Sequence, residues 1–422
     1  MSNFKLNSFK LFQLTIVFLL TFFLLNIGLY AKTTTRSATA TATVTAVHSE
    51  EIWVTLTNDL YKIAQGHIPI IHKEENSKNG LILIKINSDY LDTLSYLKHQ
   101  NPGTQGFVSH YNVKEAREYL NKENINEVQL NVPLFVDYTL TKETLVNRFI
   151  DEVLEQNIID TIKTLSDFFN RHYRSQTGVE SSQWIKNKWI TLTKGRADIT
   201  VAEFRHQFNQ PSIVLTIKGK DKPEEMLVVG GHFDSTAGYF GGASNRAPGA
   251  DDNASGISVI TETLRVLMAN NYQPSRTVMF VAYAAEEAGL LGSKDIANDC
   301  KNKRLNIVGV MQLDMTNYKG SEKDIYLISD NTNARQNEFV GTLIDKYVKV
   351  SWGQSACGYG CSDHASWNTN GYPASLPFES KSEEYNPKIH SSGDLLSVTN
   401  NRAEHSVKFA KLAIAYVLEL AK

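Results

Sequence analysis

Imidazole and carboxylate side chains stand at five places in the second half of the chain. Four of these places follow or join apolar runs that are typical of buried strands, and the fifth is a loop near the C-terminus. Nitrogen and oxygen donors without a thiolate are the ligands that zinc accepts, and cobalt or manganese can replace it. The residues are His232 and Asp234, Asp251 and Asp252, Glu286 and Glu287, Asp314, and His390.

Taken one at a time, these residues have ordinary explanations. An Asp pair before a helix is usually a cap, a Glu pair is usually a solvated face, and a His after a strand is usually a hydrogen-bonded polar residue. Together they would bring up to six carboxylates to one end of one sheet, with no matching cluster of Lys or Arg. Unpaired charges in such a place cost several kcal/mol, so an external cation is needed.

The number of ligands indicates two metal ions, with one carboxylate between them and two further ligands on each side. Such ions, about 3.5–4 Å apart, can share a bound water and lower its pKa towards 7. A carboxylate that binds no metal can then act as general base. The spacing alone does not distinguish Asp251 from Asp252, or Glu286 from Glu287.

The elements that position these residues alternate between strands and helices. Uniformly apolar strands joined by helices predict an α/β fold with a mixed, largely parallel central sheet and helices on both faces. Ligands bind beyond the carboxyl ends of the strands in such a sheet. The strand runs are SIVLTIKG, EMLVVGGHFD, TVMFVAYAAEE, NIVGVMQLDM, DIYLISD and PASLPFES, and the main helical runs lie in 143–173, 181–192, 256–271 and 408–421.

A small α+β domain is expected before this region. EEIWVTL, LILIKI (81–86) and GFVSHY (from Gly106) are strand candidates, and DYLDTLSYLKHQ (from Asp89) has helical spacing. The expected organisation is a signal peptide at 1–31, a Thr/Ala-rich linker at 32–47, the α+β domain at 48–124 and the main domain at 125–422.

The first residues predict export. Two lysines and no acid in 4–10 precede an apolar run from Leu11 to Leu29, and Ala31 offers a small residue for cleavage. An uncleaved membrane anchor is the alternative, which Gln13 and Asn26 weaken. We therefore expect a secreted protein, extracellular or periplasmic, with no other membrane contact.

Composition narrows the class of protein. Among the 422 residues, 43 Lys and Arg and 45 Asp and Glu give a net charge of −2, which argues against a nucleic-acid binder. Only three cysteines are present. Cys357 and Cys361 lie four apart in an exported chain, which predicts a loop disulfide rather than free thiols or a soft metal pair. Cys300 remains as a lone thiol, buried or partly exposed.

Seven motifs together resemble the secreted bacterial leucyl aminopeptidases, a family of di-zinc exopeptidases. They are GGHFDST, APGADDNASG, AYAAEEAGLLGS, MQLDMTNYKGS, CGYGCSDHASW, PFES and NPKIHSS, and the resemblance covers about 290 residues from near Val132 to the end. It implies a zinc-dependent aminopeptidase with two Zn²⁺ per catalytic domain. It also implies substrates with a free N-terminus and a bulky apolar, Leu-like first residue.

The resemblance assigns a role to each residue. Asp251 would bridge both zinc ions, His232 and Asp314 would complete one site, and Glu287 and His390 the other. Glu286 would be the general base. Asp234 would orient His232, and Asp252 would support Asp251, to which a cis peptide joins it in this family.

The resemblance also implies an apolar pocket beside the metals for the substrate side chain. Ser382 stands where family members can carry a large aromatic residue, and plain core packing is the alternative for Leu376 and Phe378. The matching positions are Met315, Cys357, Tyr359, Cys361, Leu376, Phe378, Tyr385 and Ile389.

The segment 48–124 resembles the propeptide of these enzymes, which assists folding, restrains activity and is removed by proteolysis. A maturation protease is then a partner, and the enzyme is expected to be a monomer. The alternative for this segment is a permanent accessory domain.

Three other functions are compatible with such a scaffold. A glutaminyl cyclase would need only three ligands for a single zinc, whereas five are present here. A non-catalytic binding domain would have lost ligands, and Glu286 is intact. A di-zinc carboxypeptidase would carry a lid domain between Asp314 and His390, and that interval is short.

Overall fold

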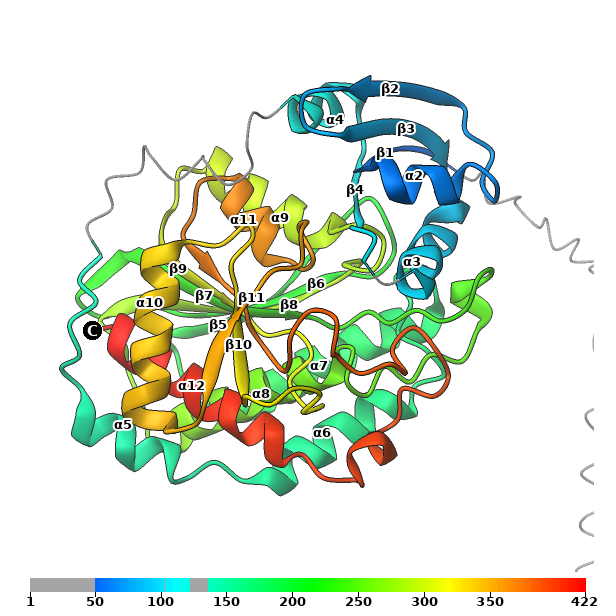
Figure 1. Ribbon diagram of the computed structural model, residues 1–422. Coiled ribbons are helices and arrows are strands. Elements are labelled where there is room, and N and C mark those ends of the chain that lie inside the picture. Colours follow the sequence, from blue (N-terminus) through cyan, green and yellow to red (C-terminus); the bar gives the residue numbers. More distant parts are fainter. Residues whose placement is uncertain (1–49, 102, 122–135) are drawn as a thin grey trace, which may run out of the picture. The chain divides into compact units, whose positions relative to one another are not determined.

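The computed structural model of the chain describes residues 50–101, 103–121 and 136–422 (Figure 1). The predicted signal peptide at 1–31, the linker at 32–47 and the domain boundary at 124/125 lie outside the described residues. None of the helices in the described ranges has the length and apolarity needed to cross a membrane.

A mixed sheet is the centre of the larger region. In the described part of the chain its six strands have the order β12-β9-β7-β8-β6-β5. The first four run parallel, and β6 and β5 are antiparallel to their neighbours. The bounds are β5 Ile199–Phe204, β6 Ser212–Ile217, β7 Lys222–His232, β8 Arg276–Tyr283, β9 Asn306–Gln312 and β12 Ala374–Ser375.

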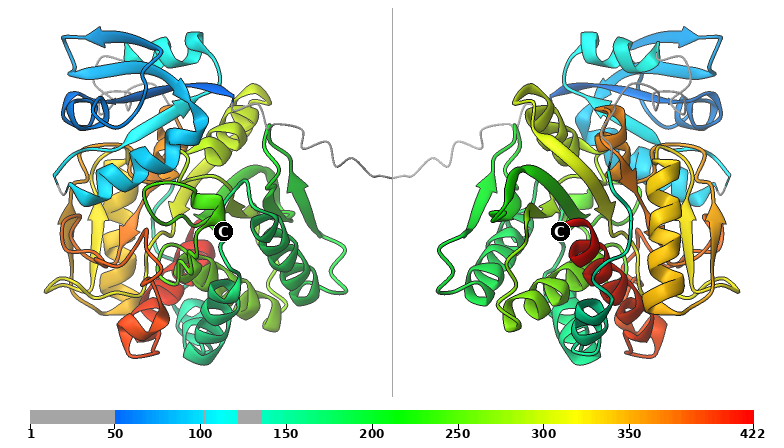
Figure 2. Two further views of the ribbon diagram at one scale, coloured as in Figure 1. Left: turned by 90° about the vertical axis from the view of Figure 1, so that its right-hand side faces the viewer. Right: turned by 90° about the vertical axis from the view of Figure 1, so that its left-hand side faces the viewer.

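Helices cover both faces of this sheet, as predicted. Alternate residues of β8 show the division: Val278 and Phe280 pack into one apolar core, and Met279 and Val281 pack into another. In Figures 1 and 2, α9 and α11 lie on one side of the sheet and α6, α8 and α12 on the other. The helices are α5 Glu143–Ile150, α6 Glu155–Asp167, α7 Gln176–Leu192, α8 Ala254–Ala269, α9 Leu291–Asn302, α10 Ala334–Leu343, α11 His364–Thr369 and α12 Glu404–Leu420.

The run PASLPFES forms two short strands rather than one. β12 pairs with β9 of the central sheet, whereas β13 (Pro377–Phe378) pairs with β10 (Ile325–Ile328) of a second sheet that also contains β11 (Trp352–Ser355). The chain changes partner at Leu376, whose carbonyl accepts a hydrogen bond from the Ile328 amide. This change of sheet depends on long-range pairing, which residue periodicity does not encode.

The N-terminal region is a four-stranded antiparallel sheet with helices. Its strand order is β2-β3-β1-β4. The strands predicted at EEIWVTL, LILIKI and GFVSHY and the helix after Asp89 are all present, while β2, α2 and α4 were not predicted. The bounds are β1 Glu51–Thr57, α2 Asn58–Ala64, β2 His72–Asn76, β3 Leu81–Asn87, α3 Leu91–Gln100, β4 Phe107–His110 and α4 Val113–Leu120.

The N-terminal region and the larger region belong to one unit that spans Ser49–Lys422. They share an apolar cluster in which Leu91 and Leu94 of α3 pack with Tyr173, Ala288 and Leu291. Contacts between the two regions can therefore be described residue by residue.

Candidate metal centre

Five of the predicted residues converge at the carboxyl ends of β7, β8 and β9. His232 ends β7 and pairs in register with Tyr283, the last residue of β8, so the two following turns lie side by side. His232, Asp252 and Asp314 form one group whose ligand atoms all lie within 4.8 Å of one another. Asp252, Glu287 and His390 form a second group of the same kind.

Asp252 belongs to both groups and presents one carboxylate oxygen to each histidine. Its Oδ1 lies 3.0 Å from His232 Nε2, and its Oδ2 lies 3.2 Å from His390 Nε2. Asp314 Oδ1 completes the first group at 3.2 Å from His232 Nε2, and Glu287 Oε2 completes the second at 2.8 Å from His390 Nε2.

The prediction that Asp251 lies between the two groups is therefore wrong. Its carboxylate points away, accepting hydrogen bonds from the Asn317 amide at 3.1 Å and from Asn386 Nδ2 at 3.0 Å. The cis peptide joins Asp252 to Asn253, not Asp251 to Asp252. The two neighbouring aspartates therefore exchange their predicted roles. Asp252, which directly precedes the helix-capping Asn253, enters the cluster, and Asp251 does not.

Asn253 ties three elements together at the cluster. Its side-chain oxygen caps α8 by accepting from the Gly256 amide at 2.9 Å, and it also accepts from the Met315 amide. Its amide group donates to the carbonyls of His232 and Leu313. Glycine is needed beside it, because a Cβ on Gly256 would lie 2.3 Å from the Leu313 carbonyl oxygen.

Asp234 links the first histidine to the paired glutamates. Its Oδ1 lies 3.4 Å from His232 Nδ1, as expected for a residue that orients this ring. The same carboxylate accepts hydrogen bonds from the amides of Glu286 and Glu287 at 3.0 and 3.1 Å. One buried Asp thus fixes both the imidazole and the turn after β8.

The electrostatics of the cluster require cations. Burial disfavours the imidazolium forms of His232 and His390, yet the surrounding carboxylates raise both pKa values well above the ordinary range. Burial also raises the pKa of Glu286, with further contributions from Glu287 and Asp314. Protonation of the two imidazole rings thus supplies the positive charge that bound metal ions would otherwise supply.

The donor set fits a pair of zinc ions. It offers imidazole nitrogens and carboxylate oxygens, with a thiolate in neither group. Glu287 Oε1 is buried and has no hydrogen-bond partner among the described residues, which leaves a free ligand atom on the cluster. Asp252, with one oxygen towards each group, has the arrangement that a bridging ligand needs.

Several residues around the cluster were missed by the sequence analysis. Asp394 accepts from the amides of Asp251 and Asp252, and Ser362 Oγ donates to Asp314 Oδ2 at 2.5 Å. Glu379 is buried beside Asp251, and burial raises its pKa well above the ordinary value. No periodic pattern marks these loop residues, because their role comes from contacts across the sequence.

One buried cation does accompany the acids. Arg171 is fully buried and donates to the carbonyls of Phe233, Leu165, Pro248 and Gly249. Burial lowers its pKa to about 10, although Asp394, Asp252 and Asp234 act in the opposite direction. Arg171 thus supports the loop before Asp251 without neutralising any one carboxylate directly.

A cavity of about 110 Å³ adjoins the cluster, and all eight predicted pocket residues line it. Ser382 lines it as well, and Glu286 faces it. The shared property of the predicted residues is an apolar or aromatic side chain, as a site for a Leu-like group requires. They are Met315, Cys357, Tyr359, Cys361, Leu376, Phe378, Tyr385 and Ile389.

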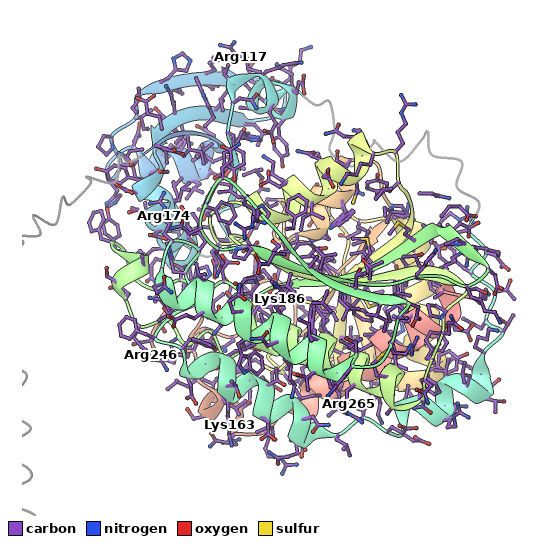
Figure 3. All side chains as sticks on the ribbon, turned by 180° about the vertical axis from the view of Figure 1, so that it is seen from behind. Arg117, Lys163, Arg174, Lys186, Arg246 and Arg265 are labelled. Atoms are coloured by element: carbon purple, nitrogen blue, oxygen red, sulfur yellow. A yellow bond between two sulfur atoms is a disulfide. The ribbon has the colours of Figure 1, made fainter. Side chains whose placement is uncertain are left out.

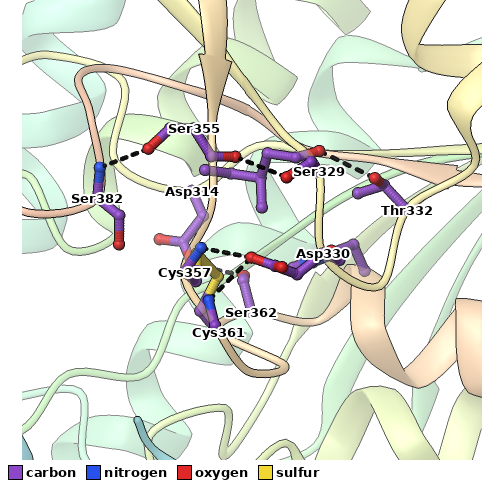
Figure 4. The surroundings of a disulfide bond; sticks show 12 residues. Asp314, Ser329, Asp330, Thr332, Ser355, Cys357, Cys361, Ser362 and Ser382 are labelled. Carbon is purple, nitrogen blue, oxygen red and sulfur yellow. Dashed lines mark hydrogen bonds between the residues drawn. A yellow bond between two sulfur atoms is a disulfide. The ribbon is translucent and has the colours of Figure 1, made fainter. Parts of the chain in front are cut away.

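The predicted disulfide between Cys357 and Cys361 is present (Figure 4), and both cysteines line this cavity. Asp330 holds the start of the loop, since its Oδ2 accepts from the amides of Cys357 and Gly358 at 2.5 and 2.9 Å. Cys300 is a buried free thiol, and burial raises its pKa to about 12.

Helix α3 of the N-terminal region contributes side chains to the lining of the cavity. Ser95 Oγ is 3.4 Å from both Glu287 Oε2 and His390 Nδ1, and Lys98 also lines the cavity. Gly106 lies against Tyr359 so closely that a Cβ would be 2.3 Å from its ring. The cluster is therefore covered by residues from outside the larger region.

Polar contacts hold α3 in this place. Asp92 Oδ1 lies 2.9 Å from His172 Nε2, and Thr93 Oγ1 donates to the Tyr239 carbonyl at 2.9 Å. Arg174, labelled in Figure 3, pairs with Asp89 at 2.6 Å just before the helix. These contacts lie just N-terminal to Ser95, the residue of α3 that reaches the metal cluster.

The chain is similar to several known proteins. Residues 212–415 match the family model described as Peptidase family M28. Leucine aminopeptidase 1 of Arthroderma gypseum is 37% identical over 291 residues, which are 66% of this chain and 77% of that protein. A probable leucine aminopeptidase of Arthroderma benhamiae is 33% identical over 349 residues, 77% of this chain and 91% of that protein.

The crystal structure of the LapA aminopeptidase from Legionella pneumophila is similar in fold. Its TM-score is 0.78 at 31% identity, and the match covers 88% of this chain and 99% of that chain. This share is larger than residues 125–422 alone could provide, so the match includes part of the N-terminal α+β region.

Proposed function

Because this chain belongs to peptidase family M28, we propose that it is a secreted zinc aminopeptidase that removes bulky apolar residues from peptide N-termini. It is a metalloexopeptidase, and the new proposal concerns how its residues perform the reaction. The observation that carries the proposal is the position of Asp252 between His232 and His390, with Glu286 facing the adjoining cavity.

We assign the ligands of two zinc ions from the two groups. His232 and Asp314 would hold one ion, Glu287 and His390 the other, and Asp252 would bind both. Bound zinc would supply a water of lowered pKa and would polarise the peptide carbonyl. Asp234 keeps the His232 ring oriented, and Asp394 and Asn253 hold the backbone on either side of Asp252.

Glu286 would be the general base. It lines the cavity, and its backbone amide is fixed by Asp234 at 3.0 Å. In this role its carboxylate takes the proton of the attacking water and passes it to the leaving amine. The substrate side chain would lie among the apolar cavity residues, and the α-amine would face the carboxylates of the cluster.

The N-terminal region would restrain this activity until it is removed. Ser95 and Lys98 of α3 lie where a substrate must enter, so substrate and α3 compete for the same space. A maturation protease would release the block by cutting between residues 121 and 136. The Cys357–Cys361 disulfide is consistent with the oxidising compartment that secretion implies.

The test uses aminoacyl amides, each with a free or an acetylated α-amine, with and without chelator. For this test, a recognition site for a specific protease is introduced between Asn121 and Val136. The protein is cut there after it has folded. We expect cleavage of free-amine Leu substrates only, abolished by chelator and increased by the cut. The Glu286→Gln variant should keep its zinc and lose about 10²- to 10⁴-fold in turnover.

Activity on acetylated substrates would exclude an aminopeptidase. Unchanged turnover in Glu286→Gln would show that another residue is the base. A cut that leaves activity unchanged would contradict an inhibitory role for the N-terminal region, and would leave the aminopeptidase assignment intact.

A further inference from the structure

The side-chain ammonium group of Lys98, on α3, lies near two tyrosine rings of the cavity wall. Its Nζ lies 5.2 Å from the centroid of the Tyr359 ring and 5.6 Å from that of Tyr385. Among the described residues its ammonium has no carboxylate partner within ion-pair distance. Two tyrosine side chains, through their rings and hydroxyls, therefore take the place that an acidic side chain usually has beside a half-buried lysine.

The two tyrosines belong to different loops that converge on the cavity. Tyr359 stands in the disulfide loop, and Tyr385 lies in the segment that leads to His390. Gly106 packs against the Tyr359 ring, and the His99 ring lies 6.1 Å from the ring of Tyr385. Residues of the N-terminal region, and not only the two loops, therefore hold the pair of rings in place.

The same cavity suits a long alkyl chain with a charged end. Leu376 and Phe378 give it an apolar wall, and the carboxyl groups of Glu286 and Glu287 also line it. A lysine stem can lie along apolar surface while its ammonium meets the rings. The pKa of Lys98 lies above its ordinary value, because the two phenols outweigh the burial that lowers it.

We propose that Tyr359 and Tyr385 form a subsite for a cationic side chain, filled by Lys98 in the full-length chain and by a lysyl or arginyl side chain of a peptide once α3 has left. This inference rests on the proposed aminopeptidase function, and extends its substrates from apolar to basic residues with long alkyl stems.

The first experiment measures binding without catalysis. The full-length Lys98→Ala variant opens the subsite, and n-butylammonium is titrated against n-butanol, which has the same chain without the charge. We expect saturable binding of n-butylammonium, about tenfold tighter than that of n-butanol, and a raised unfolding midpoint. The wild type and Lys98→Met, whose own side chains fill the site, should bind neither probe.

The second experiment measures specificity in the full chain cut after folding between Asn121 and Val136. It compares lysyl with norleucyl amide, which keeps the alkyl stem and lacks the ammonium. We expect the lysyl-to-norleucyl ratio of kcat/KM to fall about tenfold in Tyr385→Leu and by less in Tyr385→Phe, which keeps the ring and lacks the hydroxyl.

The outcomes separate this inference from the proposed function. Equal binding of the charged and neutral probes, or a ratio that is the same in all three proteins, would overturn the cation subsite. Loss of turnover on both amides with intact n-butylammonium binding would overturn the aminopeptidase proposal and keep the subsite. Should Lys98→Ala fail to fold, the kinetic comparison still decides.

Discussion

At the scale of single residues, the exchange between Asp251 and Asp252 shows how the site is built. Both carboxylates are buried next to each other in one loop. Burial, with a contribution from Asp252, raises the pKa of Asp251 to about 6, whereas His232 and His390 hold the pKa of Asp252 far below its ordinary value despite burial. Asp252 is thus the more acidic of the two, as suits a ligand between two cations.

We predict that Asp252→Asn and Asp251→Asn differ sharply in zinc content. The first removes a charged oxygen from both groups, so the purified protein should hold almost no zinc by elemental analysis. The second changes a residue whose carboxylate contacts Asn317, Asn386 and Glu379 rather than either histidine. Its zinc affinity should fall by no more than about 10- to 100-fold. Zinc loss confined to Asp251→Asn would restore the assignment made from the sequence.

At the scale of elements, the ends of β7 and β9 and the start of α8 meet at Asn253. We expect Asn253→Ala to lower the free energy of unfolding by about 3 kcal/mol or more, because buried carbonyls and amides lose their partner. Asn333→Ala is the matched control, since Asn333 caps α10 through a single bond to the Gln336 amide. That variant should lose only about 1 kcal/mol in denaturant unfolding. Equal losses would show that Asn253 is an ordinary cap.

The strands β6 to β9, the long helices and the metal-binding residue types could be predicted because they depend on local patterns. The apolar runs of β7, β8 and β9 end in the acids and histidines that converge, and parallel strands bring those ends to one edge. The choice between Asp251 and Asp252 could not be made this way, since it depends on contacts of their loop with distant positions: Asp394 accepts from the Asp252 amide, and Asn253 donates to the Leu313 carbonyl. The partner change at Leu376 has the same long-range cause.

At the scale of the whole described unit, a second polar group joins the N-terminal region to α9. Lys294 donates to the Ser109 carbonyl and lies 2.5 Å from Glu115 and 3.0 Å from His110 Nδ1. His110 is fully buried and also contacts Thr55 and the ring of Tyr119. Burial and then Lys294 lower the pKa of His110 to about 4. Burial would raise the pKa of Glu115, but His110 and Lys294 lower it to about 2.

Acid should therefore separate the cut N-terminal region from the rest of the protein. Both pKa values lie below the ordinary 6.5 and 4.5, so the docked form holds fewer protons than the separated form. The stabilisation from His110 is complete above pH 6.5 and is lost as the pH falls towards 4, and that from Glu115 is lost between 4.5 and 2. From pH 7.5 to 5, His110 alone should weaken docking by up to about 2 kcal/mol, roughly thirtyfold.

Size-exclusion chromatography of the cut protein, with chelator at both pH values, measures the separation. His110→Gln, which cannot take up a proton, should reduce the difference, and docking that is equally tight at pH 5 and 7.5 in the unaltered protein would contradict this account.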